Sequence, residues 1–164
     1  IADTITGKAQ HHDLDLSCHL FDANDNLIEV VDAQVKNASD ESGKIYHSGD
    51  NVEGLGDGDD EQISVELKDI EGYISSMIFT AAIKSGHSFT DIDVPEVRLV
   101  DGYSNHVFLQ NHLDQPEGQD KSGYVFLKLH YTREGWQMQY LDEYFAFKKK
   151  DDLSVYLKNF LKSE

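Results

Sequence analysis

The stretch from Gly49 to Glu61 constrains the fold of this chain more strongly than any other segment. It reads GDNVEGLGDGDDE and holds six carboxylates, one carboxamide and four glycines, with no basic residue. Two ionised carboxylates about 5 Å apart repel each other by roughly 0.8 kcal/mol in bulk water, and by several times more where the local dielectric is lower. A compact loop of this composition therefore resists folding unless a cation lies inside it.

The candidate ligands in this stretch are oxygen atoms, which suit a hard divalent cation. Calcium is preferred to magnesium because it accepts more ligands and a looser geometry. The four glycines allow positive φ, so that backbone carbonyl groups can turn inward as additional ligands. The sequence therefore predicts a calcium site, and the alternative is a solvated acidic turn. The spacing does not match an EF-hand loop.

A second pair of acidic residues, Asp13 and Asp15, alternates with leucines in the segment DLDLSCHL. On a strand these two side chains project from one face about 6.5–7 Å apart, which is close enough to serve one metal cluster. The leucines anchor the strand in the core and hold the carboxylates in place. The alternative is an ordinary amphipathic edge strand with solvated acidic side chains.

Composition indicates one packed domain over residues 1–164. Hydrophobic residues make up 39% of the chain, which favours a globule over a disordered acidic tail. The formal net charge of −17 argues against nucleic-acid binding, because phosphate contacts need a basic surface, and it favours bound cations. No apolar run approaches the roughly 20 residues of a membrane span, and no signal-peptide pattern is present. Since the chain begins with Ile1, we expect a part of a longer protein.

Hydrophobic periodicity is mostly two, which predicts a mainly β protein. Polar turns separate the segments, at Asn24–Asn26 and at Arg133–Gly135 for example. About eight strands without alternating helices predict a two-sheet β-sandwich with a strand core over residues 13–147. The expected strands are 13–20, Leu27–Lys36, Gln62–Lys68, Tyr73–Ile83, Glu96–Val100, Val107–His112, Gly123–Arg133 and Trp136–Phe147, with Tyr73–Ile83 central.

The C-terminal segment has helical periodicity instead. Its apolar residues follow the i, i+3, i+4 pattern and predict an amphipathic helix over about 152–162, with Asp151 or Asp152 near its N-terminal cap. Several lysines cluster here, including Lys148–Lys150. One interpretation is a helix that closes the sandwich, with its lysines exposed. The other is a helix that docks on lipid or on an acidic partner.

Two motifs occur in a fixed order. The first is Asp-Leu-Asp-Leu-Ser, from Asp13 to Ser17. The second begins at His47 and continues through Gly49-Asp50-Asn51 to the Gly-x-Gly-x-Gly-Asp-Asp-Glu run that ends at Glu61. In identity and order they resemble the TerD-type tellurium-resistance and stress-protein family. Weaker similarities continue to Trp136, so the resemblance spans about Asp13 to Trp136.

The resemblance implies a β-sandwich protein of the bacterial cytoplasm that binds calcium, typically two ions, and has no enzymatic activity. It also implies a role in stress resistance, with protein partners in a complex at the membrane surface. Carried over by position, the implied metal ligands are Asp13, Asp15, Asp50, Asn51, Asp57, Asp59, Asp60 and Glu61, with carbonyl groups of Val52, Gly54 and Gly56.

The sequence departs from the family at several points. Glu53 stands where the family usually has threonine, and the polar segment around Gly86 lacks an expected arginine–glutamine pair. The strands that open the family's domain before the first aspartates are expected to be absent here. This chain therefore resembles a divergent member.

Four further hypotheses concern catalysis by the carboxylates and the roles of the histidines and the cysteine. Clustered carboxylates could hold two cations that activate water, which would make the protein a metal-dependent hydrolase. His11 and His12 adjoin Asp13 and could form a mixed transition-metal site, although neighbouring strand residues point to opposite faces. His47 is expected to brace the acidic stretch by a hydrogen bond. Cys18 lies on the apolar face of its strand and is expected to be a structural thiol.

Overall fold

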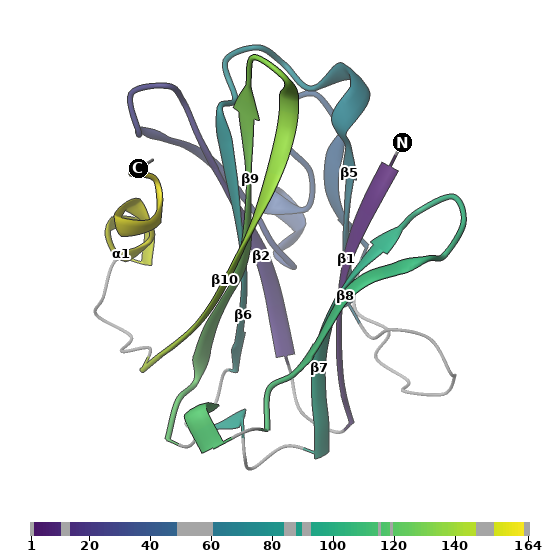
Figure 1. The fold of residues 1–164 in the computed structure, drawn as a ribbon, viewed down its shortest axis with the longest axis vertical. Coiled ribbons are helices and arrows are strands. Elements are labelled where there is room, and N and C mark those ends of the chain that lie inside the picture. Colours follow the sequence, from purple (N-terminus) through teal and green to yellow (C-terminus); the bar gives the residue numbers. More distant parts are fainter. Residues whose placement is uncertain are drawn as a thin grey trace.

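The computed structural model describes residues 2–10, 14–48, 61–83, 88–89, 93–114, 116–118, 120–146 and 153–162. Its strands form two five-stranded sheets that face each other (Figure 1). One, the β1 sheet, has the order β4-β5-β1-β7-β8, and the other, the β2 sheet, has the order β10-β9-β6-β2-β3. The strands are β1 Ala2–Gln10, β2 Leu14–Phe21, β3 Leu27–Val31, β4 Ile45–Ser48, β5 Glu61–Glu66, β6 Ser76–Ile83, β7 Asp93–Asp101, β8 Val107–His112, β9 Gly123–Thr132 and β10 Gly135–Phe145. The predicted mainly β sandwich is thus confirmed.

The main core lies between the two sheets. In β2 the apolar residues Leu14, Leu16, Cys18 and Leu20 alternate inward and are all buried, as the period of two predicts. They pack with residues of the facing sheet such as Ile63. The strand β6 lies between β9 and β2, which is the central position expected for it.

The N-terminal strand corrects the expectation from sequence. Residues Ala2–Gln10 form β1, which pairs antiparallel with β5 on one side and with β7 on the other. The expectation that no opening strand precedes Asp13 is therefore wrong, and the described residues contain ten strands instead of about eight. The segment ADTITGKAQ has too little apolar alternation to indicate a central strand, and tertiary pairing places it there.

Other boundaries shift by a few residues. The strand β3 ends at Val31, and the 3-10 helix Val35–Asn37 follows it. The short strand β4 was not predicted, because four residues give little periodicity. Further 3-10 turns among the described residues include η2 (Leu67–Asp69) and η4 (Pro116–Gly118).

The C-terminal helix covers the outer face of the β2 sheet (Figure 1). Within the described residues it comprises α1 (Leu153–Leu157) and the 3-10 turn η5 (Lys158–Phe160), which ends two residues before the predicted C-terminal boundary. The predicted cap residues Asp151 and Asp152 and the lysines Lys148–Lys150 lie outside the described residues. A second core joins the helix to the sheet through Phe21, Ile78, Val125, Leu157 and Leu161. The apolar side of this helix is therefore used in packing, as the first interpretation expects.

A buried lysine fixes the end of this segment. The Nζ atom of Lys128, on β9, donates a hydrogen bond of 2.8 Å to the carbonyl oxygen of Phe160. Burial of its side chain lowers the pKa of Lys128. Within the described residues, no helix combines the length and the apolar character that a membrane crossing requires.

A polar network joins the two sheets between β8 and β10. The Nδ2 atom of Asn111 donates to Tyr124 Oη at 2.6 Å and to Asp142 Oδ1 at 3.1 Å, and the Tyr124 hydroxyl donates to Asp142 Oδ1 at 2.7 Å. Asp142 has a φ of 50° and lies where the register of β10 shifts against β9. This bulge turns the carboxylate toward the network.

Candidate functional site

Two of the predicted metal ligands, Asp15 and Glu61, lie within the described residues. The other predicted ligands fall outside them, and so does most of the acidic stretch: Asp13, Asp50, Asn51, Val52, Gly54, Gly56, Asp57, Asp59 and Asp60. His11 and His12 also lie outside, so the mixed transition-metal site stays a prediction. The described part of the site therefore lies on β2, β4 and β5.

Asp15 lies on β2 between the buried residues Leu14 and Leu16 and is itself partly buried. Its register partner in β6 is Ala82. Alternation along β2 places Asp15 on the face of the β2 sheet that points away from the main core. Leu14 and Leu16 thus anchor this part of β2 in the core, and the role of Asp15 as a ligand stays a prediction.

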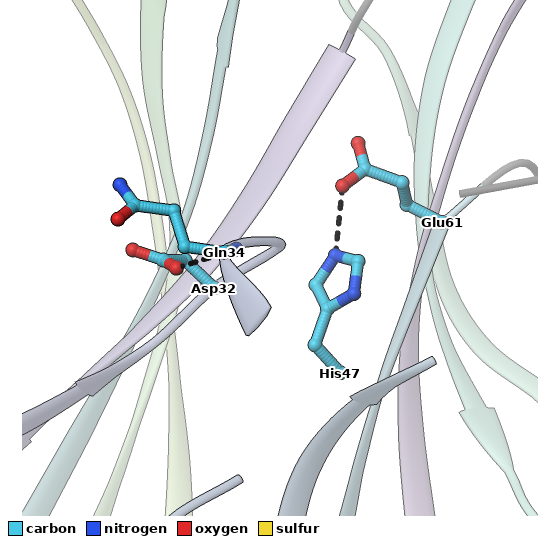
Figure 2. Close-up of polar contacts among 4 residues, drawn as sticks. All are labelled: Asp32, Gln34, His47 and Glu61. Atoms are coloured by element: carbon cyan, nitrogen blue, oxygen red, sulfur yellow. Dashed lines mark hydrogen bonds and ion pairs between the residues drawn. The ribbon is translucent and has the colours of Figure 1, made fainter. Parts of the chain in front are cut away.

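Glu61 is the first residue of β5 and follows the acidic stretch directly. Its side chain accepts a hydrogen bond at Oε1 from Nε2 of His47, on β4, over 2.7 Å (Figure 2). Both residues are buried, with 4% of Glu61 and 6% of His47 exposed. The pairing explains the contact: His47 lies opposite Ile63, and Glu61 is two residues before Ile63 on the same face.

The His47–Glu61 pair ties together the two ends of the acidic stretch. His47 lies two residues before Gly49, and Glu61 is the last residue of the stretch. Burying a carboxylate is unfavourable unless it is hydrogen-bonded, so this contact fixes where β5 begins. The hydrogen bond expected for His47 is present, and its partner is Glu61. A carboxylate has two oxygens and about four acceptor positions, so the contact is compatible with metal ligation by Glu61.

Figure 2 also draws a turn that sequence reasoning did not single out. The Oδ1 atom of Asp32 accepts a hydrogen bond of 2.9 Å from the backbone N–H of Gln34. Asn37 Nδ2 lies 3.4 Å from Asp32 Oδ2. These contacts are those of an Asx turn, which is the usual structural role of an aspartate after a strand.

The described residues do not by themselves form a metal cluster. Within that part of the chain, no group of three or more His, Cys, Asp or Glu side chains is placed to hold a metal ion. Asp15 and Glu61 belong to different sheets. The oxygen donors of the predicted set fit a hard cation in type. Complete ligation would have to come from the acidic stretch.

A serine–histidine contact also lies on β2. Ser17 Oγ is 3.1 Å from His19 Nε2 and 2.5 Å from Thr80 Oγ1 on β6. His19 and Thr80 are buried, with 5% and 2% exposed. A nucleophile needs access for its substrate, so this arrangement fits strand-to-strand packing better than catalysis.

The TerD domain family model matches residues 2–156 of the chain. The tellurium resistance protein TerZ of Serratia marcescens is 36% identical over 89 residues, which are 54% of this chain and 45% of that protein. General stress protein 16U of Bacillus subtilis (strain 168) is 30% identical over 106 residues, which are 62% of this chain and 55% of that protein. The chain therefore spans about half the length of these curated relatives.

A solved structure supports the fold independently. The crystal structure of a homologue of the telluride resistance protein TerD from Streptomyces coelicolor A3(2) superposes with a TM-score of 0.76. The superposition covers 96% of this chain and 94% of that chain at 18% sequence identity. At this level of identity the likeness establishes the shared β-rich fold.

Proposed function

Because the chain belongs to the TerD domain family, whose members include tellurium-resistance and stress proteins, we propose that it is a calcium-binding module of the stress-response type. Calcium, as two ions, would be held by Asp13, Asp15 and the ligands of the acidic stretch. One observation carries the proposal: the family match extends over residues 2–156 and includes the whole acidic stretch.

The physical role of the ion is to make the acidic stretch compatible with a compact fold. Calcium would supply the positive charge that its carboxylates lack among themselves. The His47–Glu61 contact supports this role, because it holds the end of the stretch against β4. A ligand at a hundred times its dissociation constant stabilises the folded state by about 2.7 kcal/mol. This is a large part of the total for a small domain.

We further propose that the module is not an enzyme and that it acts in the bacterial cytoplasm with protein partners of a stress-response complex at the membrane surface. These features follow from the resemblance of its motifs to the family. The competing hypothesis is a metal-dependent hydrolase. Turnover of a generic phosphate ester with magnesium or manganese, lost in Asp59→Asn/Asp60→Asn, would establish the hydrolase instead.

Calorimetric titration of chelator-stripped protein, first with calcium and then with magnesium, tests the proposal. We expect saturable calcium binding with about two ions per chain, preference over magnesium, and a calcium-dependent rise in melting temperature. The variant Asp59→Asn/Asp60→Asn should lose that rise. The control Glu117→Gln/Glu134→Gln makes the same change in net charge at exposed positions and should keep it. A melting temperature that is the same in calcium and in chelator would rule out the calcium role.

A further inference from the structure

A cavity of about 680 Å³ lies at the far end of β5 from Glu61, which is the last residue of the acidic stretch. The strand β5 begins at Glu61, next to that stretch, and its six residues lead to η2, which contributes to the cavity wall. A strand of this length spans about 20 Å. Apolar side chains of Leu67, Ile70 and Ile74 line the cavity. Its volume is within the range of ligand sites, and none of its lining residues is a proposed ion ligand.

Aromatic side chains form the other wall of the cavity: Phe108 of β8, Tyr131 of β9 and Trp136 of β10. The rings of Tyr131 and Trp136 meet edge to face with centroids 5.4 Å apart. Yet Tyr131 is 63% exposed and Phe108 is 54% exposed. Large aromatic groups that stay exposed around one cavity are typical of interaction sites.

The position of Phe108 comes from a bulge in β8. Leu99 pairs with Leu109 and Val100 pairs with Val107, so Phe108 is the extra residue between them. A bulge re-aims the side chain of its extra residue. Here the ring of Phe108 lines the cavity and also contacts His106, with ring centroids 5.0 Å apart.

The strand β8 is also an open sheet edge. Among the described strands it pairs only with β7, and its sequence VFLQNH carries no formal charge with histidine neutral. Asn111 contacts β10, so the open part is Val107–Gln110. Natural edge strands are usually protected by charge, by shortness, by a bulge or by a covering segment, and of these β8 has the bulge at Phe108 but neither charge nor a covering segment among the described residues. The other three edges have such protection: Glu29 on β3, Asp142 and Glu143 on β10, and a bridge from Ser39 to Tyr46 beside β4.

Next to the cavity, the charges that act on Tyr73 are all negative. Glu71 and Lys68 both line it and offset each other. Tyr73 lies two residues after Glu71, and its pKa is raised by burial first and then by the negative charges of Glu41, Asp40, Glu71 and Glu29, which together form the acidic rim. With a net charge of −17, the protein attracts cations and repels acidic partners.

We propose that this cavity and the open edge of β8 bind an extended peptide segment of a partner protein, with an apolar or aromatic side chain flanked by lysine or arginine. The peptide backbone pairs with Val107–Gln110 by strand addition. Its apolar side chain enters between Phe108, Tyr131 and Trp136, and its basic flanks lie over the acidic rim. Contacts between a cation and the aromatic faces add to the attraction.

The test uses Trp136, which is the only tryptophan of the chain and lines the cavity. The intact chain is titrated with tryptophan-free pentapeptides, acetyl-X-Val-Z-Val-X-amide. X is Lys, Arg or Glu, and Z is Phe, Leu, Ile or Gly. Alternation along a strand places X and Z on the same face. We expect a saturable change in tryptophan fluorescence with basic X and apolar Z, and affinity at least tenfold weaker with Glu flanks or with Gly at the centre.

Variants assign the binding to the cavity. Phe108→Ala and Tyr131→Ala should each weaken binding at least tenfold in isothermal titration calorimetry, which does not depend on fluorescence. Tyr103 is 77% exposed and lies outside the cavity, so Tyr103→Ala is the matched control and should bind as the parent does.

Four outcomes would overturn the proposal. The first three are no saturable binding by any basic peptide, binding of Glu-flanked peptides as tight as that of basic peptides, and affinity unchanged from the parent in both cavity variants. The fourth is binding of benzyltrimethylammonium as tight as that of the basic peptides, which would assign the cavity to a small organic cation. Self-association that Tyr131→Ala abolishes in sedimentation analysis would assign it to a second copy of the chain.

Discussion

Replacing His47 with alanine should destabilise the protein by about 3–5 kcal/mol, because it breaks a buried pair and leaves one partner behind. The contact with Glu61 is 2.7 Å long, and the two side chains are 1% and 5% exposed. A hydrogen bond to a charged group contributes about 1.5–3 kcal/mol, and leaving a buried polar group without its partner adds about 1–3 kcal/mol. The sum is a large fraction of the stability of an average domain.

The assay is urea unfolding followed by circular dichroism, in chelator so that ion binding does not contribute. With a slope of about 2 kcal/mol per molar, the midpoint of His47→Ala should fall by roughly 2 M. The chain supplies a matched control in the pair of His112 and Glu96, at 3.6 Å, where the histidine side chain is 50% exposed. His112→Ala should cost at most about 1 kcal/mol.

The double variant His47→Leu/Glu61→Met separates the loss of the hydrogen bond from the cost of leaving Glu61 buried without His47. Well-packed apolar residues often replace a buried ion pair without loss, so we expect this variant to be more stable than His47→Ala. If His47→Ala costs no more than His112→Ala, the contact with Glu61 does not hold the start of β5, and the reasoning is refuted.

Two further predictions concern tyrosines of β9 and β10 and the helix on the outer face of the β2 sheet. Burial raises the pKa of Tyr124, and burial together with the charge of Asp142 raises the pKa of Tyr144 to about 12, so the unfolded chain releases these protons at a lower pH than the folded chain. The melting temperature should therefore fall as the pH rises from 10 towards 12, and it should fall less steeply in Tyr144→Phe. Equal slopes in the parent and in Tyr144→Phe would contradict the assignment. Leu157→Ala should cost about 2–4 kcal/mol in urea unfolding because the side chain is fully buried, whereas Val155→Ala on the exposed side should stay within about 0.5 kcal/mol; similar losses would mean that the helix does not pack as described.

Much of the fold follows from periodicity. The alternation of Leu14, Leu16 and Leu20 predicts β2 and its buried face, and the spacing of Leu157 and Leu161 predicts the amphipathic C-terminal helix. The strand β1 escapes this reasoning because Ile5 is its only large apolar residue, and its position comes from pairing with β5 and β7. Bulges such as the one at Phe108 depend on register between two strands, which a single segment does not encode.

The candidate site also has one part that the sequence predicts and another that depends on strand pairing. Composition alone predicts a cation within the acidic stretch, because charge repulsion is independent of the detailed fold. The burial of Glu61 against His47 depends on the pairing of β4 with β5, and β4 is too short to be recognised from sequence. The cavity lined by Phe108, Tyr131 and Trp136 collects residues from three strands and carries no local motif.

The single thiol of the chain, Cys18, offers a practical consequence. It is 0% exposed, and burial, followed by the charge of Asp40, holds its pKa well above the usual value, so that little thiolate forms in the native state. An alkylating reagent can therefore reach this sulfur only after the sandwich has opened. The rate of alkylation therefore reports how often the native state opens. A slower rate in calcium would measure how much ion binding stabilises the folded state, without heat or denaturant.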